Sequence, residues 1–296
     1  MKPLLTIVVC TYNRADLLKI CLDSLVAQEL DQDFEVIVVD NNSSDYTAEV
    51  VLAFTQKSNY FRYIFEPQQG LSYARNRGAA EAGADLVAYI DDDARAWPDW
   101  AQSIVAFFEQ HSKVAAVGGP YLSYCTAAIP DWFPREYGTW SLGSKSRALG
   151  EGEWINGTNM IYRRDVLSMM GAFDTSIGMR GEELSYGEET HLLRRMKSAG
   201  HLIYYHPDIV VEHAILPHKL SLGWLLQSCY ANGYDGVQTL GYQGRWMLYL
   251  SKMPLHMGLA LFRFIFTCEP FMRARIYRAL GPLLWRLGFL ARLWAH

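Results

Sequence analysis

The sequence predicts an α/β fold, a Rossmann-like and mostly parallel sheet flanked by helices, followed by a helical C-terminal extension. Short apolar runs of strand length alternate with segments of helical spacing through the first 90 residues. This alternation is typical of a parallel sheet with right-handed crossovers. The chain has 296 residues, 50% of them hydrophobic, which is enough for a large core and one or two domains.

The first strand is predicted over Leu4–Cys10, because a continuous apolar run suits a strand that is buried on both faces. This run superficially resembles a signal peptide, but it is short and no small-residue cleavage site follows it. Apolar spacing predicts a helix over Ala15–Gln28. The alternation then continues with a strand, a helix, a strand and a helix over Phe34–Val39, Thr47–Thr55, Tyr60–Phe65 and residues 70–83.

The next strand, Leu86–Ile90, runs directly into three consecutive carboxylates at Asp91, Asp92 and Asp93. These acids would lie at the carboxyl edge of the sheet, where open α/β sheets bind ligands. Three adjacent like charges favour a bound cation, and hard divalent cations prefer carboxylate oxygens. The alternative is a solvated acidic turn that caps a helix.

Polar side chains also follow the first two strands, at Thr11 and Asp40. All three loops are expected to open on one rim of the sheet, where Asp40 would accept a hydrogen bond from a ribose hydroxyl or a base N–H. A helix cap is the alternative for Asp40. The first strand is followed neither by G-x-G-x-x-G nor by a P-loop, so neither an NAD site nor a Walker ATP site is indicated.

Several segments together resemble the family 2 glycosyltransferases, and this resemblance covers about residues 4–214. The family has the GT-A fold, uses a nucleotide-activated sugar and inverts the anomeric carbon. The segments are 8–14, 38–45, 70–78, 89–93, 154–160, 163–164, 171–174, 187–195, 205–207 and 211–213. We therefore expect a GT-A catalytic domain over 1–214, with a nucleotide-binding half (1–119) and an acceptor-binding half (120–214), before a basic amphipathic helical region (215–296).

The resemblance implies a role for each matching position. A metal, Mn²⁺ or Mg²⁺, would be held by Asp93, Asp91 and His213, although His213 could equally be a structural histidine. The residues implied in nucleotide binding are Thr11, Tyr12, Asn13, Arg14, Asp40, Asn42, Arg75, Asp91 and Asp92. Those implied in acceptor binding are Trp154, Asn156, Thr158 and Asn159. The aromatic residues Trp132, Trp140 and Trp154 could stack on a sugar or belong to the core.

The catalytic base is expected at Glu189, where the family usually has Asp, and Glu188 is the alternative. One of the two could instead cap the helix predicted over Thr190–Ser198, because a helix N-terminus favours carboxylate charge. A second Gly-Glu-Glu, at 181–183, lacks the Leu and Arg that follow the first.

The resemblance implies a metal-dependent inverting glycosyltransferase of the hexosyltransferase type. It would move a sugar from a nucleoside-diphosphate sugar, by default a UDP-sugar, to a hydroxyl acceptor in cell-surface glycan or glycolipid synthesis. Two alternatives are a nucleotidyltransferase that makes sugar nucleotides and a non-catalytic, membrane-associated GT-A scaffold. The region 121–152 is expected to be an irregular loop over the acceptor site.

The last part of the chain differs in charge from the rest. Residues 1–213 carry 18 Lys+Arg and 29 Asp+Glu, a net −11, whereas residues 214–296 carry 9 and 2, a net +7. Met253–Cys268 is strongly apolar but shorter than the roughly 20 residues of a membrane span. Phe271–Trp294 has apolar residues on one helical face and arginines on the other, with a break into two helices expected at Gly281-Pro282.

This pattern is typical of helices that lie in the headgroup plane of a membrane. We expect contact with an anionic membrane surface through residues 253–296, and hence a cytoplasmic protein that is peripheral on the inner face of the cell membrane. Packing on the catalytic domain, or a homodimer through these helices, is the alternative. A nucleic-acid partner is not expected, because the basic residues are interleaved with apolar ones. The five scattered cysteines form no C-x-x-C pair and indicate reduced thiols.

Overall fold

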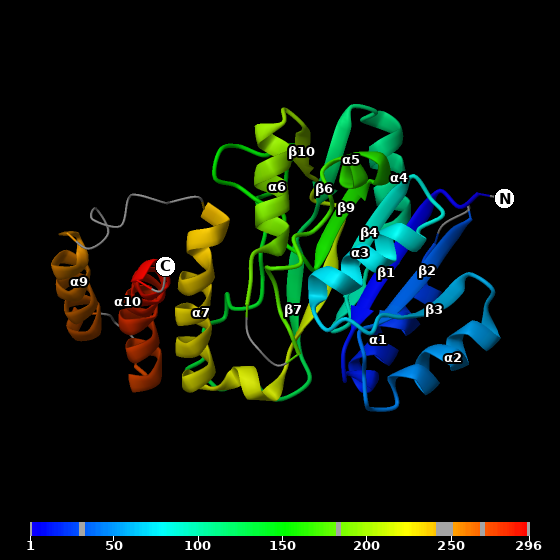
Figure 1. Cartoon of the computed structure of the whole chain (residues 1–296). Coiled ribbons are helices and arrows are strands. Elements are labelled where there is room, and N and C mark those ends of the chain that lie inside the picture. The colour runs from blue at the N-terminus through cyan, green and yellow to red at the C-terminus, as the bar shows by residue number, and fades with distance from the viewer. Residues whose placement is uncertain (1, 30–32, 182–184, 241–250, 267–269, 295–296) are drawn as a thin grey trace. The chain divides into compact units, whose positions relative to one another are not determined.

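The computed structural model describes residues 2–29, 33–181, 185–240, 251–266 and 270–294. The chain forms two compact units, which are described separately (Figure 1). Unit 1 comprises Met1–Tyr124, Gly138–Glu183 and Glu188–Ala214, and unit 2 comprises Cys125–Tyr137, Leu184–Gly187 and Ile215–His296. Part of the region predicted as a loop, Cys125–Tyr137, therefore belongs to the same unit as the C-terminal helices.

Unit 1 is built on an eight-stranded sheet. Its order is β3 (Phe61–Phe65), β2 (Phe34–Asp40), β1 (Leu5–Thr11), β4 (Leu86–Asp91), β9 (Asn159–Arg163), β6 (Val114–Gly118), β10 (Leu202–Tyr205) and β8 (Arg147–Ala148). The first four strands are mutually parallel, as are β6 and β10, which confirms the predicted mostly parallel sheet. Strand β9 lies between β4 and β6 and runs antiparallel to both. The sequence did not indicate this insertion.

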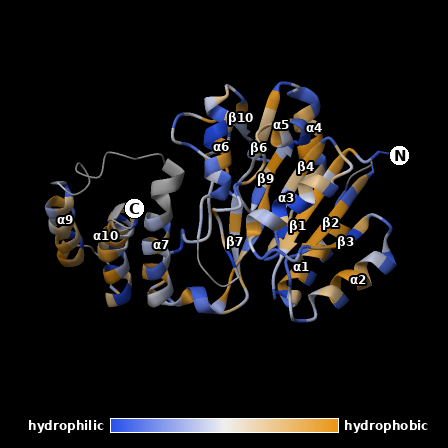
Figure 2. Ribbon diagram, in the orientation of Figure 1, coloured by the Kyte–Doolittle hydropathy of each residue, from blue (hydrophilic) through white to orange (hydrophobic). Residues whose placement is uncertain are grey.

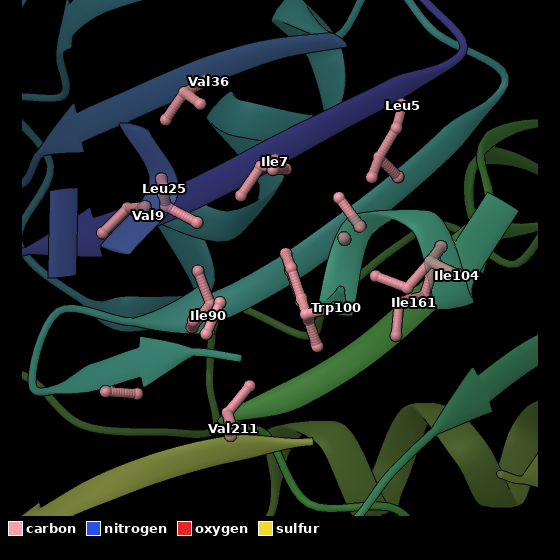
Figure 3. Close-up of a cluster of buried hydrophobic side chains, with 14 of the residues drawn as sticks. Leu5, Ile7, Val9, Leu25, Val36, Ile90, Trp100, Ile104, Ile161 and Val211 are labelled. Atoms are coloured by element: carbon pink, nitrogen blue, oxygen red, sulfur yellow. The ribbon is translucent and has the colours of Figure 1, made fainter. Parts of the chain in front are cut away.

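Helices cover both faces of the sheet, and this arrangement explains the continuous apolar strands (Figure 2). In β1, Ile7 and Val9 pack into one apolar cluster and Val8 packs into another. The first cluster includes side chains of α1 (Ala15–Val26), α2 (Thr47–Lys57) and α4 (Trp100–Gln110), and part of it is shown in Figure 3. The second includes side chains of α3 (Leu71–Glu81), α5 (Arg164–Met169) and α6 (Glu188–Ser198).

A small second sheet extends from the acidic turn at the end of β4. Its strands are β5 (Ala94–Ala96), β11 (Val211–Ile215) and β7 (Tyr121–Cys125), in that order. Strand β5 begins immediately after Asp93, and its antiparallel partner β11 places His213 opposite Ala94. Pairing between these strands therefore brings His213 next to the acids, although the two segments are far apart in the sequence.

Unit 2 contains the short 3₁₀ helix η1 (Pro217–Leu220) and the helices α7 (Leu222–Leu240), α9 (Met253–Phe266) and α10 (Met272–Trp294). Helix α10 continues through Pro282, so the expected break at Gly281-Pro282 was wrong. A proline inside a helix costs about 3 kcal/mol, and close packing against α7 offsets this cost. A Cβ on Gly233 would lie 1.8 Å from the Trp285 carbonyl oxygen, so these two helices approach backbone to backbone.

None of the helices in the described part of the chain combines the length and the hydropathy that a transmembrane segment requires.

Candidate active site

The carboxyl ends of β1, β2 and β4 form one rim, as the sequence predicted. The parallel register pairs Thr11 with Asp40 and Cys10 with Asp91. Thr11 and Asp40 are only 3% and 2% exposed, and Asp91 is partly exposed. The predicted polar rim is therefore present, and most of its polar groups are held below the surface.

Asp40 is fixed by two hydrogen bonds. Its Oδ1 accepts from the Ser43 backbone N–H at 2.9 Å, and its Oδ2 accepts from the Tyr63 hydroxyl at 2.8 Å. Burial and this hydrogen bond raise the pKa of Tyr63 to about 12, so the phenol keeps its proton. The carboxylate that accepts from the first residue of α2 is Asp45, 3.0 Å from the Thr47 nitrogen. The Asp40 carboxylate therefore makes no bond to the first residue of α2, which bonds to Asp45 instead.

Two asparagines hold the loops of this rim together. Asn13 has a left-handed backbone (φ 52°), and its Oδ1 accepts from the Ser44 N–H at 2.7 Å, which ties the β1–α1 loop to the β2–α2 loop. Asn41 was missed by sequence reasoning. Its Oδ1 accepts from the Gly70 N–H and its Nδ2 donates to the Gln68 carbonyl, at 2.8 and 2.7 Å. Its position beside Asp40 was the only signal available.

The other residues expected to bind the nucleotide also lie along this rim. Tyr12 is partly exposed, and Asn42 is exposed with a left-handed backbone (φ 65°). Arg14 Nη1 lies 3.1 Å from Asp92 Oδ1 and 3.4 Å from Asp93 Oδ2. Burial raises the pKa of Asp92 to about 6, although Arg14 opposes this shift. The guanidinium of Arg14 thus partly balances the acidic turn.

Asp91, Asp93 and His213 form a group that could hold a cation. One ligand atom from each lies within 4.8 Å of the others, and His213 Nε2 is 3.0 Å from Asp93 Oδ1. Ligands about 2.1 Å from an octahedral ion lie about 3 Å apart when adjacent, so this spacing fits a small divalent ion. Two carboxylates and one imidazole suit Mg²⁺ or Mn²⁺. The residues expected to bind metal are therefore brought together.

Arg75 connects this acidic group with helix α6. Its side chain is 3% exposed and forms an ion pair with Glu188, and its Nη2 lies 3.6 Å from Asp91 Oδ1. Burial alone would lower the pKa of Arg75, but the Glu188 and Asp91 carboxylates outweigh this effect and raise it. Gly157 leaves room for the guanidinium, because a Cβ there would lie 2.9 Å from Arg75 Nη2. Nothing near either residue in the sequence indicates that Arg75 and Glu188 are partners.

Glu188 and Glu189 are the first two residues of α6 but lie in different environments. Glu188 is 4% exposed and bound to Arg75, whereas Glu189 is partly exposed. Burial raises the pKa of Glu189 to about 8, and the adjacent Glu188 carboxylate adds to the shift while Arg75 opposes it. In the second Gly-Glu-Glu, Glu182 and Glu183 lie outside the described residues.

The four residues expected to bind the acceptor do not share one environment. Trp154 is 42% exposed, and Asn156 is partly exposed and accepts from the Thr158 N–H at 3.0 Å. The Thr158 side chain is buried. Asn159 is completely buried, so the structure does not support its expected contact with an acceptor.

Asn159 instead connects β9 to neighbouring segments through hydrogen bonds of its side chain. Its Oδ1 accepts from Trp100 Nε1 at 3.0 Å, and its Nδ2 donates to the carbonyls of Pro120 and Ile209 at 3.1 and 2.7 Å. All its strong hydrogen-bonding groups are therefore engaged within the fold. Among the tryptophans, Trp140 stacks on Tyr121 with ring centroids 6.3 Å apart, which agrees with the packing alternative for that residue.

The chain is similar in sequence to known glycosyltransferases. The family described as Glycosyl transferase family 2 matches residues 6–170, more than half of the chain. The chain is 31% identical over 237 residues to the glucosyl-dolichyl phosphate glucuronosyltransferase of Haloferax volcanii, covering 78% of this chain and 75% of that protein. It is 28% identical to the succinoglycan biosynthesis protein ExoM of Rhizobium meliloti, covering 76% of this chain and 71% of that protein.

Solved structures share the fold. The mannosyltransferase PcManGT from Pyrobaculum calidifontis, in complex with GDP-Man and Mn²⁺, has a TM-score of 0.65 and 19% identity, covering 100% of this chain and 88% of that chain. S. aureus TarS 1–349, in complex with UDP, has a TM-score of 0.57 and 16% identity, covering 99% of this chain and 92% of that chain. Taken with the sequence matches and the arrangement of the rim, these likenesses show that the chain belongs to glycosyl transferase family 2, has the GT-A fold and is a glycosyltransferase.

Proposed function

We propose that this protein is a metal-dependent, inverting glycosyltransferase of the hexosyltransferase type, which acts in glycan or glycolipid synthesis. The donor would be a nucleoside-diphosphate sugar, by default a UDP-sugar, and the acceptor a hydroxyl group. The observation that carries this proposal is the position of Arg75, which bridges Asp91 of the acidic group and Glu188 at the start of α6. Donor-binding and base-providing groups are thus adjacent.

The nucleotide is proposed to bind along the rim of β1, β2 and β4. Asp40 is held rigidly by Ser43 and Tyr63, and its carboxylate oxygens retain lone pairs for a base N–H or a ribose hydroxyl. Thr11 lies beside it in register. Tyr12, Asn13, Arg14, Asn42, Arg75, Asp91 and Asp92 complete the proposed set of nucleotide-binding residues.

Asp91, Asp93 and His213 are proposed to hold the metal, which on binding would supply Lewis-acid stabilisation of the leaving diphosphate. Either Mn²⁺ or Mg²⁺ fits the two carboxylates, and the imidazole favours Mn²⁺. Arg14 and Arg75 already lie beside the acids. Their guanidinium groups can donate paired hydrogen bonds to phosphate oxygens.

Glu189 is proposed as the general base. Its neighbour Glu188 is paired with Arg75, whereas Glu189 is a partly exposed residue with a raised pKa. As the acceptor oxygen forms its bond to the anomeric carbon, Glu189 takes the hydroxyl proton. The bond between that carbon and the diphosphate breaks, and the diphosphate leaves with the electron pair. Attack from the side opposite the leaving group inverts the anomeric carbon.

The acceptor is proposed to be a glycan or a lipid-linked sugar at a membrane. Trp154, Asn156 and Thr158, which precede β9, remain the proposed acceptor side of the site. The Haloferax volcanii relative is named for its action on a lipid-linked sugar, glucosyl-dolichyl phosphate. The basic charge of residues 214–296 supports a peripheral location on the inner face of the cell membrane.

A thermal-shift screen of UDP-, GDP- and dTDP-sugars, with and without Mn²⁺, tests the donor class. We expect one nucleotide to raise the melting temperature only when Mn²⁺ is present, and the same pair to support sugar transfer or slow donor hydrolysis that EDTA abolishes. Release of pyrophosphate from a nucleoside triphosphate would identify a nucleotidyltransferase instead. Absence of metal-dependent nucleotide binding by calorimetry would identify a non-catalytic scaffold.

A further inference from the structure

We propose that unit 2 carries a binding site for the phosphate headgroup of an anionic membrane lipid. The site is a cavity lined by α7, α9 and α10, and the exposed apolar face of α9 enters the same lipid layer. This site lies entirely in the C-terminal helices and is separate from the proposed sugar-transfer chemistry. It narrows the expected membrane contact of residues 253–296 to particular residues and a particular headgroup chemistry.

The cavity has a volume of about 550 Å³, and its lining comes from three helices. Cys229 belongs to α7, Arg263 to α9, and Tyr277, Arg278 and Trp285 to α10. Two arginines thus line a cavity whose other lining residues are largely aromatic and apolar. This volume is within the usual range of about 300–1,000 Å³ for small-ligand sites.

The polar groups of the cavity suit a phosphate. An arginine guanidinium is planar, remains charged and matches the oxygens of a phosphate in pairs. Arg278 Nη2 is 4.0 Å from Glu136 Oε1, and both side chains are exposed, so this ion pair contributes little. Burial raises the pKa of Tyr277 to about 12, so its hydroxyl stays protonated and is hydrogen-bonded to Cys229 in the cavity wall.

Helix α9 consists mostly of hydrophobic residues (Figure 2), and its apolar side chains are exposed over most of its circumference. Its buried residue is Ala260, and Met253, His256 and Phe264 on the same side are partly buried. The remaining large side chains are 39–64% exposed, namely Leu255, Met257, Leu259, Leu261, Phe262, Ile265 and Phe266. Burying such side chains contributes about 1.5–3 kcal/mol each, and the 14-residue helix, roughly 21 Å long, would lie in the interface plane.

The charge of the C-terminal segment indicates which partner covers the apolar face of α9. Residues 251–296 contain one lysine and six arginines but a single acid, Glu269, a net charge of +6. An anionic lipid surface attracts such a segment by about 1 kcal/mol for each basic residue near it. Two copies of this strongly basic segment would repel each other, which disfavours a homodimer through it. An apolar helix beside a basic cavity therefore fits an anionic lipid better than a second copy of the chain.

Co-sedimentation of the full chain with vesicles tests the site. We expect strong binding to phosphatidylcholine vesicles that contain phosphatidylglycerol and weak binding to phosphatidylcholine alone. Arg278→Ala and Arg263→Ala should each weaken binding about tenfold or more, because each loses a charged hydrogen bond to phosphate. The matched control Arg273→Ala removes an exposed arginine at the start of α10 that does not line the cavity. This control should lower the affinity for the vesicles only about fivefold, which is the general electrostatic effect of one basic residue.

Arg278→Lys separates charge from geometry, because it keeps the charge but loses the paired donors. We expect Arg278→Lys to bind vesicles more weakly than the wild type and more strongly than Arg278→Ala. If Arg273→Ala and Arg278→Ala lowered the affinity for vesicles equally, the proposed site would be wrong. General electrostatic attraction to the membrane surface would then explain the binding. The lipid assignment would be overturned if the chain did not bind anionic vesicles and instead formed a dimer that Phe262→Ser disrupts. That result would indicate a subunit interface.

A soluble lipid distinguishes the source of the phosphate. Short-chain phosphatidylglycerol should raise the melting temperature of the wild type and of Arg273→Ala, but not that of the double variant Arg263→Ala/Arg278→Ala. An equal shift with inorganic phosphate would show a phosphate site with no preference for lipid and would overturn the proposal. These experiments measure lipid binding and do not require sugar transfer. Their outcome is therefore independent of the outcome of the donor screen.

Discussion

Arg75 Nη1 and Glu188 Oε1 form a buried ion pair that joins helix α3 to helix α6 across 113 residues of sequence. Their side chains are 3% and 6% exposed. Two buried charges balance each other, but removal of either one leaves the other desolvated and unpaired. The pair therefore links the start of α6 to α3, and this commitment of Glu188 is why Glu189 is the proposed base.

Arg75→Met should destabilise the protein by about 3–5 kcal/mol, because it leaves Glu188 buried without a counter-charge. Urea unfolding followed by circular dichroism measures this loss. The double variant Arg75→Met/Glu188→Leu should recover much of it, since no unpaired charge remains. The control Lys19→Ala breaks an exposed ion pair with Asp23 and should cost less than about 1 kcal/mol. Equal costs for Arg75→Met and Lys19→Ala would contradict a buried pair.

Glu189→Gln should lower the rate of sugar transfer by about 10²–10⁴-fold, because the amide accepts no proton. In the wild type, kcat/KM should rise with pH toward about 8, since Glu189 must lose its proton before it acts as a base. This limb of the pH profile should be missing in Glu189→Gln and retained, at a lower rate, in Glu189→Asp. A Gln variant with the wild-type rate and pH profile would exclude Glu189 as the base.

The same residue should make stability depend on pH. The pKa of Glu189 is about 8 in the folded protein, whereas the ordinary value of 4.5 applies to the unfolded chain. Between pH 4.5 and 8, the folded state therefore holds a proton that the unfolded chain has released. The free energy of unfolding should therefore fall as pH rises from about 4.5 to 8. Glu189→Gln removes this contribution and should melt at a higher temperature than the wild type at pH 8, with little difference near pH 4.5. Identical melting at both values would argue against the raised pKa.

Asp93→Asn and His213→Gln should each weaken Mn²⁺ binding, because each removes one ligand from the group within 4.8 Å. Calorimetry with Mn²⁺ and the nucleotide found in the donor screen measures this change directly. Asp23→Asn removes an exposed carboxylate on α1 and provides a control for charge. We expect EDTA to stop transfer and added Mn²⁺ to restore it. Unchanged Mn²⁺ affinity in both variants would place the metal elsewhere.

The rim could be predicted because its signals are local. Apolar runs identified β1, β2 and β4, and parallel pairing then required Thr11, Asp40 and Asp91 to lie at one edge. The acids and the Glu188–Glu189 pair are likewise short motifs in the sequence. A pattern within a few residues is therefore enough to locate the polar groups of the site.

Contacts between distant segments could not be predicted in this way. Nothing near Arg75 in the sequence indicates that Glu188 is its partner, and nothing near Asn41 indicates that it holds Gly70. The continuity of α10 through Pro282 depends on close packing with α7, which overrides the local preference of proline. These features arise only when the tertiary structure brings the elements together.

Asn159 illustrates the same limit and provides a further test. Asn159→Ala should destabilise the protein by about 2–5 kcal/mol, because it leaves Trp100 Nε1 and the carbonyls of Pro120 and Ile209 without their partner. Under conditions where the variant is folded, KM for the acceptor should stay near the wild-type value.

The matched variant Trp154→Ala should behave in the opposite way, with little change in unfolding free energy, since the side chain is 42% exposed, and a raised KM for the acceptor. Urea unfolding and initial rates at varied acceptor concentration measure the two effects. If Asn159→Ala raised KM without loss of stability, its carboxamide would have to reach the acceptor. The three buried hydrogen bonds would then contribute little to the fold.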